Sequence, residues 1–486
     1  MADTNADWST DSNKAINISL VNSSGQGIKT LYSFNPKMTY QIFGEEESIF
    51  GYQGLKINLR YNACDMRPGL QITYGKKFKT IGETEPTDLK AIMEEFLPKT
   101  AFEKSNVFES TIADSSYENF QPPGELWQTM EAGGQTYEIW KGNLADMAVQ
   151  QLVKRIQILV LFYIEGGNYI ELRDADTTLE RWTVFFLYQK KTVDVDPKTS
   201  PYVFMGYSTV FRYFYYQPIT PPSSPPAKKQ RISREADLDF QLPLPELQFS
   251  DFTCRSRISQ FVILPPFQGG GNGSRLYNSI FDCYLGDPKT LEITVEDPNE
   301  AFDDLRDLND LARLRTVPEF SALRINTEAA PRAKGPVPND IIDSEKLEKI
   351  RTSMKIAPRQ FARLVELQLL SRIPSNIRQS LLVERPTSTV PDLKTKQHEY
   401  RLWKLWTKSR LYRHNKDTLI QLDRVERIEK LDEALGSVEA DYARLLRALH
   451  QRQDSKTEAA SSTGKRPPPD GDADDGEPSS KKAKFA

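Results

Sequence analysis

The chain has 486 residues, 38% of them hydrophobic and 10% aromatic, which is enough to build two to four globular domains. Its formal net charge of -3 argues against a general nucleic-acid binder but leaves room for local acidic surfaces that hold basic substrates. Three cysteines make no disulfide framework, and with only three histidines, all after residue 397, a zinc site or a Cys/His nucleophile pair is not expected. Because no signal peptide and no membrane-spanning run is evident, we expect a soluble intracellular protein.

The first part of the chain has the pattern of an α+β domain. Residues 15–21 and 54–61 alternate as strands do, and 88–96 have helical spacing. Between them stands an acidic triplet, Glu45-Glu46-Glu47, in a stretch that we expect to be a loop. Such a run is most often only a solvated turn.

From residue 144 the pattern changes to a helix followed by strands. Residues 144–155 have helical spacing, and the runs 156–164, 182–189 and 203–216 are rich in β-branched and aromatic residues. We expect these runs to be strands of a mostly antiparallel sheet. Glu165 ends the first run beside two glycines, where a carboxylate is either an ordinary polar terminator or a site residue.

The stretch 258–299 predicts a strand, a glycine loop, a helix and a second strand. In the second strand Leu291, Ile293 and Val295 are expected to share one face. Four glycines within 268–273 would free backbone N–H groups at the helix N-terminus, where the helix dipole favours a phosphate. A tight strand-to-helix turn explains the glycines equally well. The loop lacks the lysine of a P-loop, and the neighbouring sequence lacks the parallel crossover units of a dinucleotide fold.

These motifs together resemble a known family. QGGGNG fits the Gln/Arg-x-x-Gly-x-Gly/Ala signature of the acetyl-CoA-dependent N-acetyltransferase (GNAT) superfamily, and LPPFQGGGNG followed by LEITVEDPNEAFDDLRD is similar to the type B histone acetyltransferase catalytic subunit. The resemblance spans roughly residues 15 to 380 and is closest to a fungal form. Its upstream matches are QIFGEEESIFGYQGLKI at 41–57, FYIEGGNYI at 162–170, ERWTVFFLY at 180–188 and GYSTVFRYFYY at 206–216.

The resemblance implies an enzyme that transfers acetyl from acetyl-CoA to lysine side chains in the N-terminal tail of newly made histone H4, before chromatin assembly. It implies histone H3 in the complex, a WD-repeat histone-binding chaperone subunit, a place in both cytoplasm and nucleus, and links to telomeric silencing and DNA repair. It implies no metal, no direct nucleic-acid partner and no membrane. Two rivals stay open: an acetyltransferase for protein N-termini or small amines, and a non-catalytic histone-binding scaffold.

The resemblance also implies site residues. Glu296 is our prediction for the general base that takes the lysine proton, with direct attack on the thioester, and Glu165 and Asp297 are reserves. The predicted cofactor contacts are Phe261, Val262, Ile263, Gln268, Gly269, Gly270, Gly271, Asn272, Gly273, Ser274 and Asn299. The predicted histone-tail contacts are Glu45, Glu46, Glu47, Trp182, Phe211, Arg212 and Tyr213, although core packing is the alternative for some of the aromatic residues.

The expected fold class is α+β in three domains. These are an N-terminal α+β domain at 15–143, a GNAT α/β sandwich at 144–317 and a helical domain at 340–452. By composition we expect disorder at 1–14, in an insertion at 218–247 and in a tail at 453–486.

Two features of the second half stay open. The basic stretches 228–231 and 465–484 resemble nuclear import signals, or are solvated charge runs. The last long helix has apolar residues three and four apart from Ile428 to Leu449, which predicts either a coiled coil or a helix folded back on its own domain.

Overall fold

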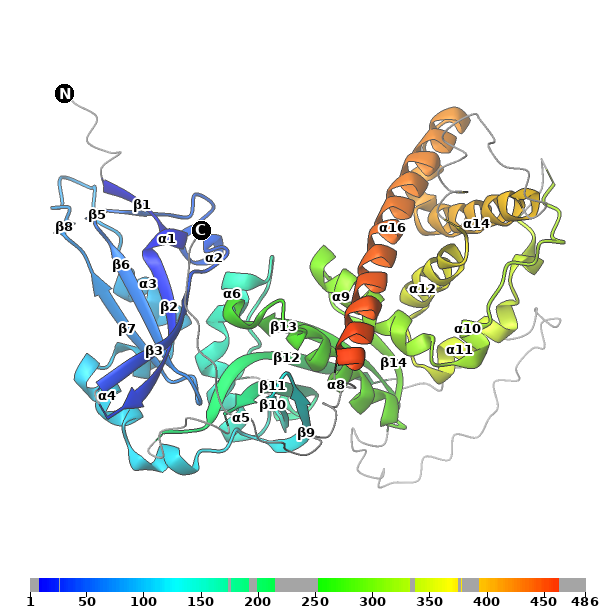
Figure 1. The fold of residues 1–486 in the computed structure, drawn as a ribbon. Coiled ribbons are helices and arrows are strands. Elements are labelled where there is room, and N and C mark those ends of the chain that lie inside the picture. Colours follow the sequence, from blue (N-terminus) through cyan, green and yellow to red (C-terminus); the bar gives the residue numbers. More distant parts are fainter. Residues whose placement is uncertain are drawn as a thin grey trace, which may run out of the picture. The chain divides into compact units, whose positions relative to one another are not determined.

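A computed structural model describes residues 8–25, 27–173, 176–191, 199–214, 252–332, 337–374, 377 and 393–462, and the fold is mixed α+β (Figure 1). The chain forms two compact units. The first is Met1–Ala322 with Asp343–Leu364, and the second is Leu323–Ile342 with Val365–Ala486. No helix in the described part is both long and apolar enough to cross a membrane. The predicted insertion at 218–247, the basic stretch 228–231 and the end of the chain from 463 lie outside the described residues.

The N-terminal part of the first unit contains a four-stranded sheet in the order β3-β2-β6-β7. The strands predicted at 15–21 and 54–61 are confirmed as β2 and β6, and the helix predicted at 88–96 as α3, which Asp88 caps. The bounds are β2 (Ile16–Ser24), β3 (Gly27–Phe34), β6 (Lys56–Asn62), β7 (Pro68–Thr73), α3 (Leu89–Phe96) and α4 (Ser105–Ile112). Shorter elements around it are α2 (Tyr40–Phe43), β4 (Ser48–Phe50), β5 (Tyr52–Gln53) and β8 (Lys76–Lys77).

The prediction of disorder up to residue 14 is wrong for residues 8–14. They form β1 (Ser9–Asp11), which pairs with β4, and α1 (Ser12–Ala15). The Ser12 hydroxyl is fully buried and donates to the backbone carbonyl of Glu47 at 2.6 Å, and the Trp8 ring lies 5.5 Å from that of Phe78. Composition missed this order because the segment is polar in sequence and is held by partners distant in the chain.

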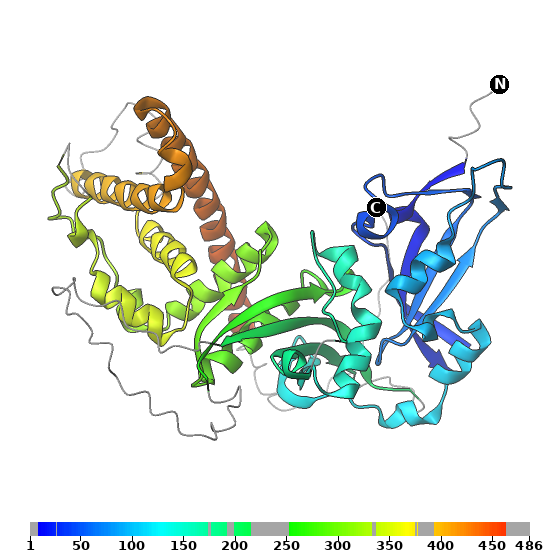
Figure 2. The ribbon, with the colours of Figure 1, turned by 180° about the vertical axis from the view of Figure 1, so that it is seen from behind.

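A six-stranded sheet follows, in the order β14-β13-β12-β11-β10-β9 (Figure 2). Its neighbours are antiparallel except for the parallel pair β13–β14, which α8 connects. The strands are β9 (Glu125–Ala132), β10 (Gln135–Asn143), β11 (Trp182–Lys190), β12 (Tyr202–Phe214), β13 (Cys254–Ile263) and β14 (Thr290–Val295). The strands predicted at 182–189 and 203–216 are confirmed. The sheet starts at Glu125, however, ahead of residue 144, where the sequence placed the second domain boundary.

The strand predicted at 156–164 is a helix. The chain forms α5 (Met147–Ile156) and then α6 (Ile158–Tyr163), whose residues Ile158 to Phe162 are all buried. A fully buried helix shows no polar face, so its apolar run has no helical period and imitates a buried strand. The helix predicted just before it, at 144–155, is confirmed as α5.

Two longer helices pack on the other face of this sheet. They are α8 (Asn272–Gly286) and α9 (Glu300–Leu314), and the Phe185 ring of β11 lies 6.1 Å from the Tyr284 ring of α8. The alternation expected in β14 holds only in part, because Ile293 is buried while Leu291 is 37% exposed on this edge strand. The first unit also includes α7 (Asp176–Leu179), α10 (Pro318–Ser321), α11 (Ser344–Ser353) and the start of α12 (Pro358–Ser371).

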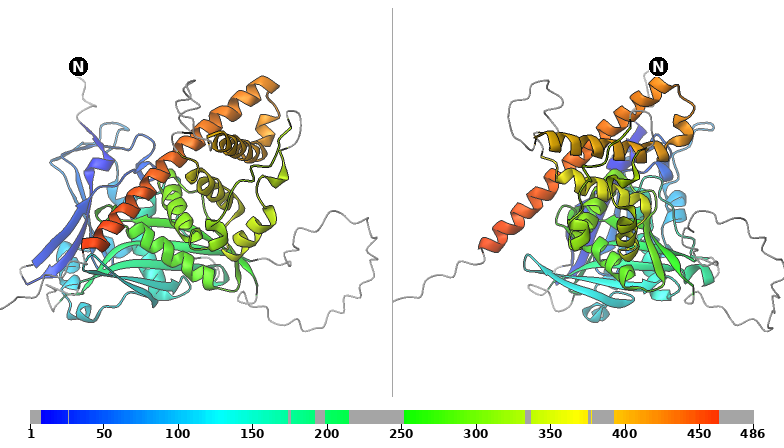
Figure 3. Two further views of the ribbon diagram at one scale, coloured as in Figure 1. Left: turned by 45° about the vertical axis from the view of Figure 1, so that its right-hand side comes forward. Right: turned by 90° about the vertical axis from the view of Figure 1, so that its right-hand side faces the viewer.

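The second unit is helical in its described part and contains the rest of α12, α14 (Leu393–His414), α15 (Lys416–Leu419) and α16 (Arg424–Ser462) (Figure 3). The Glu366 carboxylate is fully buried and accepts from the Arg410 guanidinium at 2.6 and 2.9 Å and from the Tyr442 hydroxyl at 2.9 Å. Leu445 and Leu449 of α16 are buried too. This helix therefore packs back on its own unit, and it continues to Ser462, through the first ten residues of the tail expected from 453.

Candidate active site

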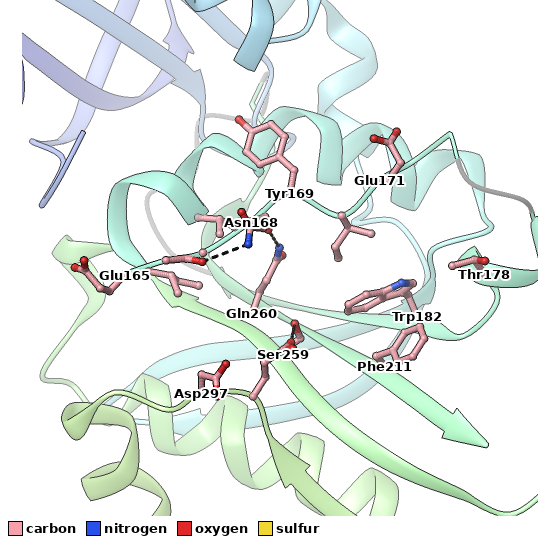
Figure 4. A pocket seen from close by; sticks show the side chains of 16 residues that line it. Glu165, Asn168, Tyr169, Glu171, Thr178, Trp182, Phe211, Ser259, Gln260 and Asp297 are labelled. Atoms are coloured by element: carbon pink, nitrogen blue, oxygen red, sulfur yellow. Dashed lines mark hydrogen bonds between the residues drawn. The ribbon is translucent and has the colours of Figure 1, made fainter. Parts of the chain in front are cut away.

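A cavity of about 450 Å³ lies in the first unit, between the chain that follows α6 and the strands β11 to β13 (Figure 4). Because its lining comes from five separate parts of the sequence, at 160–171, 178–182, 211, 259–260 and 296–297, folding brings together residues that no single motif contains. The lining residues are Val160, Ile164, Glu165, Gly166, Gly167, Asn168, Tyr169, Ile170, Glu171, Thr178, Trp182, Phe211, Ser259, Gln260, Glu296 and Asp297.

Four carboxylates line this cavity. Glu165 and Glu171 come from the chain after α6, while Glu296 and Asp297 follow directly after β14. The described lining contains no Lys, Arg or His. The structure thus places the predicted base and both of its reserves in one cavity, and it adds Glu171, which the sequence gave no reason to select. A concave site whose lining has several carboxylates and no cationic side chain attracts a positively charged side chain.

Glu296 is held at the end of β14 by contacts with β13. Its backbone N–H donates to the Ile258 carbonyl at 2.8 Å. The Ser259 hydroxyl donates to Oε2 of its carboxylate, and the guanidinium of Arg257 lies 3.3 Å from Oε1. With 39% of the side chain exposed, the carboxylate remains open to the cavity and to solvent.

A β-bulge in β13 aims two consecutive residues at the cavity. Between the pairs Ser208↔Phe261 and Val210↔Ile258, β13 has one more residue than β12. The extra residue lets Ser259 and Gln260 both line the cavity, which strict alternation would prevent. The Gln260 amide donates to the Asn168 carbonyl at 2.8 Å and so fixes the loop on the opposite wall.

Glu165 and Asp297 are exposed neighbours of the predicted base. Glu165 follows helix α6 rather than a strand, and the next residue, Gly166, donates its N–H to the Tyr40 hydroxyl at 2.9 Å. Asp297 has a φ of 31°, a left-handed conformation that residues other than glycine rarely adopt. Strain of this kind is concentrated at functional sites, where the surrounding structure maintains it.

The predicted aromatic contacts form a row on the cavity side of the sheet. Trp182 and Phe211 are register partners whose rings lie 4.7 Å apart, and the Tyr213 ring lies 4.8 Å from Phe211. Arg212 points to the opposite face, because side chains alternate along a strand. Its guanidinium pairs there with Asp287 at 3.2 Å. The structure therefore does not bring Arg212 together with the other predicted tail contacts.

The acidic triplet divides into two exposed residues and one that is engaged. Glu45 and Glu46 are exposed in the turn between α2 and β4. Glu47 accepts from the Asn13 amide at 2.7 Å and from the backbone N–H of Thr39 at 2.5 Å. Its carboxylate holds the N-terminal segment in place, so only Glu45 and Glu46 have carboxylates pointing freely into solvent.

The glycine loop forms the N-terminus of α8, as predicted. Gly269 and Gly271 have φ values of 79° and 78°, and Gly271 is the N-cap residue of the helix. The Gln268 amide donates to the Ile263 carbonyl at 2.8 Å, which ties the loop to the end of β13. The loop is also closed by the Asn272 amide, which donates to the Phe267 carbonyl at 2.8 Å. The first turn of α8 therefore has a fixed backbone in front of it.

Next to this loop, one edge of β13 is open. The pairing of β13 with β14 ends at Ile258↔Val295, whereas β13 continues to Ile263. On that side the segment from Ser259 to Ile263 has no strand partner in the described part of the chain. Phe261, in its middle, packs its ring 5.0 Å from Phe302 of α9. An open strand edge presents backbone donors and acceptors that an extended ligand can use.

The remaining predicted cofactor contacts lie where α8 and α9 begin. Asn299 is the N-cap residue of α9, and its side chain accepts from the Phe302 N–H at 2.9 Å. The Ser274 hydroxyl accepts from the Asn309 amide at 3.0 Å. The described residues contain no group of three His, Cys, Asp or Glu side chains that could hold a metal ion.

Sequence reasoning missed the residues that hold the predicted base. Ser259 and Arg257 lie in the same strand as the predicted Phe261, but nothing in the sequence marks the bulge or the alignment of β13 with Glu296. Gln260, Asn168 and Glu171 were missed for the same reason. The available signal was the polar stretch before the apolar run of β13, in a sheet where most strands are apolar.

Known proteins are similar to this chain over most of its length. Residues 8–165 match the family described as Histone acetyl transferase HAT1 N-terminus, and residues 307–373 match Fungal HAT1, C-terminal. The chain is 48% identical over 481 residues to the histone acetyltransferase type B catalytic subunit of Pyricularia oryzae, covering 98% of each chain. It is 48% identical to the same subunit of Gibberella zeae, covering 93% of this chain and 94% of the relative. For Neurospora crassa the identity is 44%, covering 90% and 88%.

Proposed function

The chain belongs to the family of histone acetyltransferase type B catalytic subunits, and from that premise we propose that the cavity of Figure 4 is where a histone lysine is deprotonated and acetylated. The protein is a histone acetyltransferase, with acetyl-CoA as its cosubstrate. The observation that carries the proposal is the convergence of Glu165, Glu296 and Asp297 on one cavity without a lining cation.

The chemistry requires a base because a lysine amine is protonated at neutral pH, with a reference pKa of about 10.4. Glu296 is our proposal for that base. Its carboxylate accepts from the Ser259 hydroxyl, forms an ion pair with Arg257 and remains open to the cavity. The proton passes from the amine nitrogen to a Glu296 oxygen, directly or through one water, which leaves the nitrogen lone pair free to attack. Glu165 and Asp297 then contribute negative charge that holds the incoming ammonium group.

Acetyl-CoA supplies the acetyl group, and the chain has a matching place for an extended, phosphorylated ligand. The open edge of β13 from Ser259 to Ile263 ends at the glycine loop, which in turn ends at the N-terminus of α8. Backbone groups along the edge suit the pantetheine arm, and the helix N-terminus suits the pyrophosphate. The bulge residue Ser259 lies at the start of this edge and contacts Glu296. This continuity supports the proposal, because Glu296 lies at one end of the open edge and the glycine loop at the other.

The six-stranded sheet supports the finer proposal of a GNAT fold. The parallel pair β13–β14 is connected through α8, and the partners separate after Ile258. Helices α5 and α6 on one face and α8 on the other make an α/β sandwich around an otherwise antiparallel sheet. The cosubstrate and the acceptor would thus approach Glu296 along different walls.

For the acceptor we propose the lysine-rich N-terminal tail of histone H4, presented together with H3. The acidic cavity and the exposed carboxylates of Glu45 and Glu46 provide a negative field that draws such a tail. The WD-repeat chaperone subunit and the work in cytoplasm and nucleus remain proposals that rest on the family resemblance. The import signals at 228–231 and 465–484 remain proposals that rest on their basic residues, with solvated charge runs as the alternative.

The acceptor class is tested by supplying the full chain with acetyl-CoA and a panel of acceptors: an H4 tail peptide, the same peptide with every lysine replaced by arginine, and a small amine. Site-resolved mass spectrometry should find acetyl groups on lysine side chains of the first peptide only. Acetylation of the peptide N-terminus or of the small amine at a similar rate would favour the rival acetyltransferase. No release of CoA with any acceptor would favour the non-catalytic scaffold.

A further inference from the structure

Each carboxylate oxygen of Glu296 has its own partner on β13. Oε2 accepts from the Ser259 hydroxyl, and Oε1 lies 3.3 Å from Nη2 of Arg257. Both donors come from β13, two residues apart across the bulge. A glutamate side chain has three rotatable bonds, so without such donors its carboxylate would sample several orientations at the end of β14.

Arg257 is itself held in place. Its Nη1 donates to the Tyr213 hydroxyl at 2.9 Å, and its guanidinium lies over the Tyr213 ring at 5.5 Å from the centroid. Arg257 is the register partner of Phe211 on β12 and of Thr294 on β14. The guanidinium therefore spans from the aromatic row on β12 to the carboxylate that follows β14.

We propose that Arg257, held by Tyr213, and Ser259 are positioning residues that fix the carboxylate of Glu296 for proton removal. This inference rests on the proposed role of Glu296 as the base. The inference gives Tyr213 a role besides the histone-tail contact expected from the resemblance. Its hydroxyl contacts Arg257, and Arg257 in turn contacts the proposed base. The three residues and Glu296 are together called the carboxylate clamp below.

The carboxylate clamp still allows Glu296 to accept a proton. A carboxylate offers about four acceptor positions, and the two donors occupy two of them, so a lone pair on each oxygen remains for the lysine proton. Because Arg257 has a rigid planar guanidinium, its bridging geometry to two partners cannot be reproduced fully by lysine. The donors also act before substrate arrives, which lowers the reorganisation needed in the reaction.

The strand offers a matched control. Arg255, two residues earlier on the same face of β13, pairs with Glu292 at 3.2 Å. Neither Arg255 nor Glu292 lines the cavity. Arg255→Leu therefore removes an equivalent strand-to-strand ion pair without touching Glu296.

The test is a double-mutant cycle in the full chain, with an H4 tail peptide and acetyl-CoA as substrates. Ser259→Ala and Arg257→Leu should each lower kcat by roughly tenfold to a hundredfold, since a displacement of about 1 Å at a reacting group has effects of that order. The KM for acetyl-CoA should stay within about twofold. Tyr213→Phe, which keeps the ring, should lower kcat by less, and Arg257→Lys should restore part of the loss. Arg255→Leu should leave kcat unchanged.

Combining Arg257→Leu with Glu296→Gln tests whether Arg257 acts through Glu296 or independently of it. In the Glu296→Gln background, Arg257→Leu should cause no further loss, because the base that it positions is already gone. Losses that multiply in the double variant, or full kcat in both Ser259→Ala and Arg257→Leu, would overturn the inference. If Arg257→Leu does not fold, Tyr213→Phe takes its place in the cycle. Full turnover by Glu296→Gln alone would instead refute the proposed base, and the clamp with it.

Discussion

Glu47 shows that neighbouring residues of one type can have different tasks. Its carboxylate accepts from the Asn13 amide and the Thr39 N–H, whereas Glu45 and Glu46 are exposed. In the sequence the three are indistinguishable, because the partners of Glu47 lie 34 and 8 residues away. The family resemblance could therefore point to the triplet, but it could not indicate that Glu47 is engaged in hydrogen bonds while Glu45 and Glu46 are exposed.

Because Glu47 is engaged and Glu45 and Glu46 are exposed, we expect substitutions at the two kinds of position to change different properties. Glu45→Gln with Glu46→Gln should raise the KM for the H4 tail peptide by roughly two- to tenfold at low salt and leave the KM for acetyl-CoA alone, since exposed charges contribute little each and are screened. Glu47→Gln should instead lower the melting temperature, because hydrogen bonds to a carboxylate contribute about 1.5–3 kcal/mol. Steady-state kinetics and thermal unfolding check both. An unchanged peptide KM in the double variant would show that Glu45 and Glu46 form only a solvated turn and do not bind the tail.

Asp310 supplies a prediction about pH and stability. It is fully buried on α9, accepts from the Tyr277 hydroxyl at 2.8 Å, and burial raises its pKa from the ordinary value of 3.8 to about 6. The folded state then holds a proton that the unfolded state has released, so this group's contribution to stability falls as pH rises from about 4 to about 6. Asp310→Asn, which does not titrate, should remove that slope, an effect of at most about 3 kcal/mol. Urea unfolding from pH 4 to 7 measures it, and parallel curves for the variant and the parent protein would contradict the assignment.

At the scale of elements, periodicity predicted those with one buried face and failed where burial was complete or irregular. The strands β11 and β12 and the helix α8 were predicted from their runs and spacing, whereas α6 was mistaken for a strand because all its residues from Ile158 to Phe162 are buried. The bulge in β13 could not be predicted from the sequence either, because one extra residue in a strand does not change the composition of the segment. The resemblance could thus point to Glu296 and to the glycine loop at the start of α8, but not to Ser259 and Arg257, which contact the Glu296 carboxylate.

The loop at the start of α8 gives a prediction at this scale. Gly271 has a φ of 78°, and a Cβ there would have no neighbour closer than 3.7 Å, so a methyl group would enter the open space at the helix N-terminus. Gly271→Ala should raise the Kd for acetyl-CoA by blocking the backbone approach, with a cost in stability of about 1–2 kcal/mol from the left-handed φ. Gly286→Ala, at the far end of α8 with open space around its Cβ, is the control and should leave the Kd unchanged. Equal affinities by calorimetry for Gly271→Ala and the parent would reject a phosphate site here.

At the scale of the molecule, the chain forms one unit that contains the six-stranded sheet and a helical unit around the buried Glu366. The residues that the sequence assigned to one helical domain are shared between them, since Asp343–Leu364 groups with the sheet. Amphipathic helices indicate that a core exists but not which core they join. A sequence can therefore predict α11 and α12 without predicting the unit to which each belongs.

The connection between β12 and β13 is predicted to be dispensable for the fold. Phe214 and Cys254, at its two ends, are register partners in the sheet, so a short turn can join the strands. Replacing 221–245 with a Gly-Ser linker of a few residues should leave the melting temperature and the kcat on an H4 peptide nearly unchanged, because the segment lacks the apolar residues of a core. A fall of several degrees in the melting temperature would show that this segment packs against the rest of the protein.

The central claim is that Glu296 takes the proton from the acceptor lysine, and the turnover of Glu296→Gln tests it most directly. The substitution keeps the shape and the Ser259 contact but removes the basicity. General-base catalysis contributes about 10² to 10⁴ in rate, so kcat at neutral pH should fall by that factor while the Kd for acetyl-CoA holds. The residual rate should climb as pH rises, because a growing fraction of free amine replaces the missing base. Full turnover of Glu296→Gln at neutral pH would contradict the account.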